Sequence, residues 1–227
     1  MSAEISQTEA LFDKLNVNYE EAFDGVAGQH NSINWVLSEL EAAGIKPAKI
    51  VDIGCGTGRP VCERFAAAGH DVLGVDLSSG MIEAARERVP MAKFEKCDVR
   101  EFNPPAGSYD VVTVFFSLIA GVTQADIRAT IARIYGFIKP GGLFVFATVP
   151  LDTENADIMW MGQPVRVSSI STDDVLLTIK KAGFEVVSQE ESKFKPEKAV
   201  DVGLCGPEDV WEEDHIFVYA KRPSTSG

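Results

Sequence analysis

Long apolar segments are missing from this chain of 227 residues. No apolar run approaches the roughly 18 residues that a membrane-spanning helix needs. The N-terminal sequence MSAEISQTEA also lacks the basic and apolar regions of a secretory signal. The sequence therefore predicts a protein of the cytoplasm that makes no use of a membrane.

Histidine and cysteine are scarce. The three histidines lack metal-ligand spacing and the acidic residues are scattered, so no metal site is predicted. The four cysteines form no CxxC pair and no zinc-ribbon spacing, and the chain has no secretory signal, so reduced thiols are expected. A pairing of Cys55 with Cys62 stays open in principle.

Basic residues are outnumbered. The chain has 21 Lys and Arg against 34 Asp and Glu, a net charge of -13 and a pI near 4.7. No local basic patch offsets this negative field, which repels phosphate backbones. Nucleic acid is therefore a poor candidate for a partner, and oligomeric state is not determined by the sequence.

Residues 49–76 carry the strongest pattern, KIVDIGCGTGRPVCERFAAAGHDVLGVD. A β-branched run over 49–53 predicts a strand, and three alternating glycines, Gly54, Gly56 and Gly58, follow it directly. A helix is expected over 59–68, with Pro60 in its first turn, and then a second strand that ends at Asp76. A carboxylate in that position can accept hydrogen bonds from the two hydroxyls of a ribose. The segment is therefore interpreted as an adenosine-binding unit.

The glycine spacing distinguishes between adenosine ligands. A dinucleotide fingerprint, G-x-G-x-x-G, would need glycine at position 59, where this chain has Arg59. The pattern is D-x-G-x-G-x-G instead, and Asp52 places a carboxylate beside the loop, where a cationic ligand group would be favoured. A positively charged amino acid joined to adenosine fits these residues better than a dinucleotide.

The segment resembles the class I S-adenosylmethionine-dependent methyltransferases. The first family motif is matched by VDIGCGTG (51–58) and the second by GVDLS (74–78). Further matches follow in order: KCDVRE (96–101), SYDVVTVFFSL (108–118) and IKPGG (138–142). A lone glycine loop could be only a tight turn, but five ordered matches favour the family. The resemblance covers roughly residues 19–222.

The resemblance implies an α/β fold, a Rossmann-like doubly wound sheet of seven strands whose antiparallel last strand lies beside the fifth. Alternation of strand and helix patterns agrees with such a sheet. One methyltransferase domain over 1–227 is expected, made of an N-terminal helical cap (1–45), a cofactor-binding half (46–150), a substrate-side half (151–222) and a tail (223–227). Two helices are expected in the cap, at 6–23 and 32–43, separated by Gly25 and Gly28, with Asn31 or Ser32 as the second N-cap.

The resemblance also implies cofactor contacts. Leu77 and Met81 would flank the adenine, while Asp98 would accept a hydrogen bond from its 6-amino group and Val99 would donate through its backbone. Asp98 could instead be a turn residue or an N-cap. The full set of expected S-adenosylmethionine-binding residues is Tyr19, Asp52, Gly54, Cys55, Gly56, Thr57, Gly58, Asp76, Leu77, Met81, Asp98, Val99, Phe115 and Phe116.

Substrate residues are expected at the same sheet edge. Phe116 and Ser117 end the strand over 110–116, and the chain has FFSL where family members that methylate amino groups often carry Asn-Pro-Pro-Tyr. Two segments, 150–169 and 195–214, are interpreted as irregular lids that carry further substrate contacts at Met159, Trp160, Met161 and Trp211. Padding of the sheet edge is the alternative interpretation for these side chains.

The chemistry that follows is methyl transfer from S-adenosylmethionine to an oxygen, nitrogen or sulfur atom of a small-molecule metabolite. The protein must align the reactants and, for some acceptors, remove a proton. Candidate bases are His30 and His215, with Asp214 a weaker one, although an isolated histidine is more often structural. Alternatives are a non-catalytic or repurposed cofactor-binding scaffold, a protein methyltransferase and an NAD(P)-dependent oxidoreductase.

Overall fold

A seven-stranded sheet forms the centre of this computed structural model, which describes residues 3–224 apart from the side chains of residues 3–6 and 16. The strand order is β3-β2-β1-β4-β5-β9-β8. In chain order these strands are β1 (Lys49–Ile53), β2 (Asp71–Asp76), β3 (Lys93–Lys96), β4 (Tyr109–Phe115), β5 (Ile138–Thr148), β8 (Glu185–Phe194) and β9 (Glu213–Lys221). A separate two-stranded hairpin consists of β6 (Thr153–Trp160) and β7 (Gln163–Ser169).

Strand directions agree with the fold expected from the sequence. β1 pairs in parallel with β2 and β4, so that Ile53 lies between Val75 and Val114. β9 runs antiparallel to both of its neighbours, β5 and β8. The prediction of a doubly wound sheet whose antiparallel last strand lies beside the fifth is confirmed. Because β9 is antiparallel, it begins at the edge where the parallel strands end.

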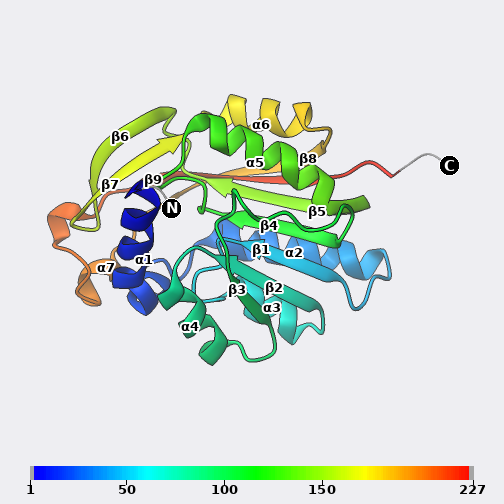
Figure 1. Cartoon of the computed structure of the whole chain (residues 1–227), viewed down its shortest axis with the longest axis horizontal. Helices are drawn as coiled ribbons and strands as arrows, with labels where there is room; N and C mark the ends of the chain where they lie inside the picture. Colours follow the sequence, from blue (N-terminus) through cyan, green and yellow to red (C-terminus); the bar gives the residue numbers. More distant parts are fainter. Residues whose placement is uncertain (1–2, 225–227) are drawn as a thin grey trace.

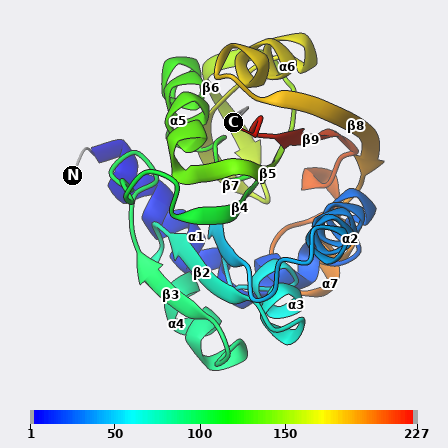
Figure 2. The ribbon, with the colours of Figure 1, turned by 90° about the vertical axis from the view of Figure 1, so that its right-hand side faces the viewer.

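Helices cover both faces of the sheet (Figures 1 and 2). They are α1 (Ala3–Ala22), α2 (Ala27–Ala42), α3 (Val61–Ala67), α4 (Ser79–Arg88), α5 (Gln124–Phe137) and α6 (Thr172–Lys181), followed by the short α7 (Lys198–Asp201) and a 3-10 turn over Pro207–Asp209. α2, α3 and α4 pack on one face, through residues such as Ile33, Phe65 and Ile82. α5 and α6 pack on the other, through Ile131 and Ile179 among others.

Serine and threonine caps start three of these helices. The Ser78 hydroxyl accepts from the Met81 amide, and the Ser171 side chain accepts from the Asp174 amide. Thr123 and Asp126 form a reciprocal capping box at α5. α3 begins at Val61 with Pro60 as its N-cap, two residues later than expected.

The start of α2 differs from the prediction. The helix begins at Ala27, so Asn31 and Ser32 lie inside it and neither is its N-cap. Gly28 does not interrupt the helix: a Cβ there would lie 2.2 Å from the ring of Phe217. Gly28 therefore permits close packing of α2 on β9, a tertiary reason that the local sequence does not reveal.

The segment over 150–169, expected to be an irregular lid, is mostly the β6–β7 hairpin. Trp160 pairs with Gln163, and the two loop residues, Met161 and Gly162, have φ values of 50° and 65°. Positive φ at both positions is the geometry of a two-residue hairpin turn, which Gly162 favours. Residues 195–214 are largely irregular, as expected, apart from α7 and the 3-10 turn.

Three segments gather over the carboxyl ends of the parallel strands: α1, the β6–β7 hairpin and the chain around α7 (Figure 1). α1 contacts α4, where Asp13 accepts from the Gly80 amide at 2.9 Å, and it contacts the hairpin, where Lys14 donates to Gln163 at 2.9 Å. Within the described residues, no helix combines the length and apolarity needed to cross a membrane.

Gly54 should tolerate alanine less well than other glycines with positive φ. Its φ is +73°, and a Cβ would lie 2.0 Å from the Ser117 Cβ. At Gly44, φ is +66°, but a Cβ there would have no neighbouring atom within 4 Å. Gly44→Ala should cost about 1–2 kcal/mol of unfolding free energy from the backbone alone. Gly54→Ala should cost roughly 1–3 kcal/mol more because it also overpacks the strand ends. Urea unfolding measures both losses, and equal losses would contradict this account.

Candidate active site

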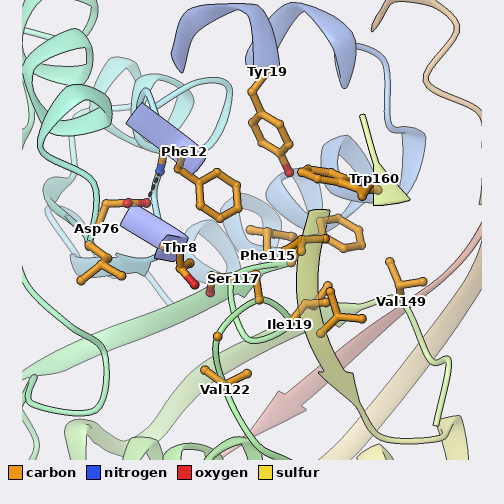
Figure 3. Close-up of a pocket in the computed structure, with 18 of the residues that line it drawn as sticks. Thr8, Phe12, Tyr19, Asp76, Phe115, Ser117, Ile119, Val122, Val149 and Trp160 are labelled. Carbon is orange, nitrogen blue, oxygen red and sulfur yellow. Dashed lines mark hydrogen bonds between the residues drawn. The ribbon is translucent and has the colours of Figure 1, made fainter. Parts of the chain in front are cut away.

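Asp76 and the glycine loop are held together by backbone hydrogen bonds. The Gly54 and Cys55 amides donate to the Val75 carbonyl at 2.7 and 3.0 Å, which ties the loop to β2. Asp76 then accepts from the Gly56 amide through Oδ2 and from the Ser78 amide through Oδ1, both at 2.9 Å. Burial raises the pKa of Asp76, although these amides oppose the shift. The carboxylate lines a cavity (Figure 3) and keeps free lone pairs for two adjacent hydroxyl groups.

Asp52 lies beneath the loop and is 2% exposed. The Thr113 hydroxyl donates to its Oδ1 at 2.6 Å, and the Cys62 thiol lies 3.7 Å from its Oδ2. Burial raises the pKa of Asp52 to about 7, against the effect of these two hydrogen bonds. The expected ionised carboxylate beside the loop is therefore a buried, largely desolvated group, close to its titration point at neutral pH. All four cysteine thiols are free in the structure.

The far end of the cavity is formed by residues after β2 and β3. Leu77, Met81, Asp98 and Val99 all line it, as expected. Asp98 accepts from Arg100 at 2.7 Å, and although burial alone would raise the pKa of Asp98, the hydrogen bonds from Arg100 outweigh it and lower this pKa. The sequence analysis missed Arg100, which already occupies part of the acceptor capacity expected of Asp98.

Helix α1 closes the cavity from above. Thr8, Phe12 and Tyr19 line it from one side of the helix (Figure 3). Tyr19 is half-buried, and its desolvation, with smaller contributions from the charges of Glu213 and Asp76, raises its pKa. Glu20 accepts from the Thr57 hydroxyl of the glycine loop and from Arg88 at 2.6 Å. The N-terminal helix therefore binds the loop directly and does more than cover the sheet.

Two cavities meet below α1. The first, about 280 Å³, runs from Asp76 to the hairpin; the second, about 410 Å³, lies beside the glycine loop. The second is lined by Asp52, Cys55, Thr57 and His30. Both cavities are lined by six residues, which mark the junction between them: Tyr19, Phe23, Gly54, Gly56, Phe115 and Phe116. Ten of the fourteen expected cofactor residues line the first cavity and three others line the second.

Gly58 is the remaining member of the expected cofactor set and lines neither cavity. A Cβ at this position would lie 2.9 Å from the Phe94 ring, so Gly58 serves the packing of the loop on β3. The sequence could not show that Gly58 has a packing role, because it occupies the same alternating pattern as the cavity-lining Gly54 and Gly56. The other two glycines of the pattern, Gly54 and Gly56, line both cavities at the ligand edge of the sheet.

The wall opposite Asp76 is apolar. Ile119, Val122 and Val149 follow β4 and β5 (Figure 3). The hairpin adds Ile158, Val165 and Val167. Among the expected substrate residues, Phe116, Ser117, Trp160 and Trp211 line this cavity.

Met159 and Met161 do not line it, contrary to expectation. Alternation along β6 sends Ile158 and Trp160 inward and leaves Met159 53% exposed. Met161, in the hairpin turn, is buried against Ala22 and Ala199 instead. The alternation could not be applied from the sequence because the segment was taken for a loop.

His215 lies at the first cavity, where the antiparallel direction of β9 predicts it. It is 2% exposed, and its ring centroid lies 4.5 Å from that of Phe116, a residue with φ of 55°. His215 Nε2 lies 3.3 Å from Oε2 of Glu213, whose Oε1 accepts from Trp160 Nε1 at 3.1 Å. The structure does not bring the two candidate histidines together, since His30 lines only the second cavity.

Glu213 was missed by the sequence analysis. It precedes His215 by two positions on a strand, so the two side chains share a face, and this spacing is the signal that could have identified it. In the part of the chain that the structure describes, no group of three or more His, Cys, Asp or Glu side chains is arranged to hold a metal ion.

Comparison with known proteins agrees with this architecture. A family model described as "Methyltransferase domain" matches residues 50–142. Demethylmenaquinone methyltransferase of Symbiobacterium thermophilum is 30% identical over 144 residues, which are 60% of this chain and 56% of that protein. The chain spans about half the length of the curated relatives that it matches.

Solved structures share the fold over nearly the whole chain. Magnesium protoporphyrin IX methyltransferase from Synechocystis PCC 6803, solved with bound SAH, has a TM-score of 0.68 at 17% identity and covers 96% of this chain and 99% of its own. The [4+2]-cyclase SpnF has a TM-score of 0.69 at 18% identity, with 98% of each chain covered. The resemblance inferred from the motifs is confirmed: a methyltransferase-domain model matches residues 50–142, and the chain shares the fold of solved S-adenosylmethionine-dependent methyltransferases.

Asp52→Asn should change how stability depends on pH. Because folding raises the pKa of Asp52 from 3.8 to about 7, its stabilising contribution is present below pH 4 and is lost as pH rises through 7. At about 1.4 kcal/mol per pKa unit, this loss amounts to about 4 kcal/mol in the wild-type protein. The asparagine oxygen can still accept from Thr113 and its NH₂ group can donate to the Cys62 sulfur. Asparagine does not titrate, so the variant should lack this decline. Urea unfolding of both proteins from pH 4 to 8 measures it, and parallel profiles would contradict the assignment.

Proposed function

We propose that this protein transfers a methyl group from S-adenosylmethionine to an oxygen, nitrogen or sulfur atom of a small molecule. One observation carries the proposal: the Asp76 carboxylate, which is hydrogen-bonded to the glycine loop and suited to a ribose, lines the same cavity as an apolar wall. The junction at Tyr19 and Phe116 joins this cavity to the space beside the loop. A ligand with an adenosine part and an amino acid part matches these two connected spaces.

The described residues fit this cofactor. Asp76 would hold the ribose hydroxyls, Leu77 and Met81 the adenine faces, and the loop from Gly54 to Thr57 the amino acid part, with Asp52 beneath it. When bound, the cofactor supplies an electrophilic methyl group on a positively charged sulfur. Because the cofactor activates itself in this way, the protein mainly has to align the acceptor, exclude water and accept a proton where the acceptor carries one.

A small-molecule acceptor is supported by the enclosure of the site. α1 and the hairpin close the cavity on two sides, and its wall beyond the junction consists of aliphatic and aromatic side chains. A peptide groove, which a protein methyltransferase would need, is not what these residues form. Two similar proteins, demethylmenaquinone methyltransferase and magnesium protoporphyrin IX methyltransferase, are named for small-molecule acceptors. His215 is the candidate base, since it lies on the acceptor side.

The second candidate is a repurposed member of the fold. The [4+2]-cyclase SpnF shares this architecture over 98% of the chain. A scaffold or cyclase could retain the cofactor cavity without methyl transfer. An oxidoreductase is disfavoured because Arg59 stands at the third fingerprint position and the chain has no Tyr-x-x-x-Lys pair.

Calorimetric titration with S-adenosylhomocysteine tests the proposal. The wild-type protein should bind it with micromolar affinity and should not bind NAD. Asp76→Asn should weaken binding at least about 10-fold, because a neutral amide replaces a charged acceptor of two hydrogen bonds. Asp71→Asn is the matched control, since Asp71 lies at the other end of β2 and pairs with Lys93. Binding of NAD, or of neither ligand, would refute the proposed cofactor.

A further inference from the structure

Glu213 is a buried carboxylate whose two oxygens face two different donors. The residue is 8% exposed and lies at the start of β9. Trp160 Nε1, which can only donate, lies 3.1 Å from Oε1, and His215 Nε2 lies 3.3 Å from Oε2. The neighbouring acids Glu212 and Asp214 are exposed at the rim of the same cavity and lie beside Lys193. Of these three acids, only Glu213 has a buried side chain.

This arrangement determines the tautomer of His215. An ionised carboxylate is acceptor-only, so the hydrogen bond at Oε2 requires the imidazole proton to be on Nε2. A neutral imidazole carries only one proton. Nδ1 therefore keeps a lone pair and can act only as an acceptor or a base.

His215 Nδ1 has no hydrogen-bond partner among the described residues, although it is buried. The ring that carries it lines the first cavity and is packed between Phe116 and Phe194, with centroid distances of 4.5 and 5.9 Å. A buried acceptor without a donor costs free energy, and unmatched groups of this kind are uncommon in folded proteins. The missing donor is most simply a group of the ligand that fills the cavity.

We propose that the acceptor substrate is an apolar molecule carrying a neutral hydroxyl group, which donates to His215 Nδ1, and that Glu213 and Trp160 are positioning residues that fix this tautomer. The inference rests on the proposed function for its chemistry. Its geometric part, a hydroxyl bound at Nδ1, does not require that function. A hydroxyl satisfies Nδ1, whereas an ether or a ketone offers it no donor.

The proton balance follows from this geometry. The O–H bond of the substrate breaks and its proton moves to Nδ1, which leaves an imidazolium next to the Glu213 carboxylate. The electron pair of that oxygen forms the new bond to the methyl carbon. The bond from the carbon to sulfur breaks, and its electron pair stays on sulfur as a neutral thioether. The carboxylate stabilises the cation that forms on His215, as in other acid–histidine pairs.

A cationic substrate is the competing interpretation of the same residues. Tyr19, Phe23 and Trp160 surround part of the site, and aromatic rings with a carboxylate can bind an ammonium group. In this protein, however, both Glu213 oxygens already face donors, and the unmatched atom is an acceptor on histidine. An ammonium group could itself donate to Nδ1, but its charge would find no free oxygen on Glu213, because both oxygens already face donors.

Nitrogen NMR of the histidine rings tests the tautomer in the ligand-free protein. The chain has three histidines, so a His215→Gln variant assigns the signals. Wild-type His215 should carry its proton on Nε2. In Glu213→Gln the amide oxygen should accept from Trp160, which leaves the amide NH₂ facing His215 and moves the ring proton to Nδ1. The double variant Glu213→Gln/Trp160→Phe should restore the wild-type tautomer. Phenylalanine has no N–H donor, so the side-chain amide at position 213 can turn its oxygen toward His215 Nε2.

Glu191→Gln is the matched control for that measurement. Glu191 is exposed on the neighbouring strand β8, opposite Ile216, so the variant loses the same charge without facing His215. Its His215 signals should stay in the wild-type pattern. A proton on Nδ1 in the wild-type protein, or no change in Glu213→Gln, would overturn the assignment.

Ligand preference tests the substrate class with three probes of one shape: 1-naphthol, 1-methoxynaphthalene and 1-naphthylmethylamine. Tryptophan fluorescence should show that the wild-type protein binds 1-naphthol at least about 10-fold more tightly than the methyl ether, a difference of about 1.4 kcal/mol. In Glu213→Gln this preference should disappear, because Nδ1 would then carry a hydrogen. Tighter binding of the amine, or equal binding of naphthol and its ether, would overturn the proposal.

S-adenosylhomocysteine binding separates this inference from the proposed function. Glu213→Gln should bind S-adenosylhomocysteine like the wild-type protein, because Glu213 contributes to the acceptor side. If the wild-type protein does not bind S-adenosylhomocysteine, the proposed function fails. The His215 tautomer and the preference for 1-naphthol over its methyl ether would still test whether a hydroxyl group binds at Nδ1. With naphthol as a methyl acceptor, Glu213→Gln should lose about 10²- to 10⁴-fold in kcat/KM, the usual contribution of a general base.

Discussion

The contact between Asp76 and the Gly56 amide is the constraint on which the site depends. It joins the end of β2 to the glycine loop that leaves β1, and the Val75 carbonyl reinforces this connection by accepting from the first two loop amides. The loop can follow this path because its glycines adopt positive φ. A carboxylate used in this way is both a structural acceptor and a ligand group. Loss of the charge would therefore affect the shape of the loop as well as the affinity of the site.

Closure of the site depends on segments that are far apart in the sequence. α1 contacts the glycine loop through Glu20 and the hairpin through Lys14, so one helix connects the cofactor side with the acceptor side. Tyr19 of α1 and Phe23, the residue that follows the helix, both pack against Trp160 of β6, with ring-centroid distances of 5.9 Å. Such a cluster excludes water where the two cavities meet. The N-terminal helix, the hairpin and β9 therefore act as one assembly at the sheet edge.

The fold and the ribose end of the site could be predicted from the sequence because local patterns determine them: β-branched strands, serine caps and glycines placed next to a strand end. Position 58 shows the limit of a motif, since its glycine serves packing against Phe94. The hairpin was missed because the apolar Met159 lies on the exposed face, the register shifts between Thr153 and Ala156, and Met161–Gly162 is an uncommon turn pair. Glu20 was missed because its partners lie on other elements. Arg100 and Glu213 were missed because each pairs with a residue two positions away, in a turn for Arg100 and on a strand for Glu213. Tertiary packing determines these contacts.

The electrostatic character of the site follows from three carboxyl groups with little contact to water. Asp52 and Glu213 are buried and Asp76 is half-buried, in a chain that is already strongly acidic, and desolvation raises the pKa of Asp52 and of Asp76. A neutral ligand would leave this cost in place, whereas a ligand with separated positive charges would reduce it at more than one point. The acceptor side differs because the Glu213 charge is directed at His215 and Trp160. The same kind of residue therefore favours a cation near the glycine loop and a neutral proton donor beyond the junction.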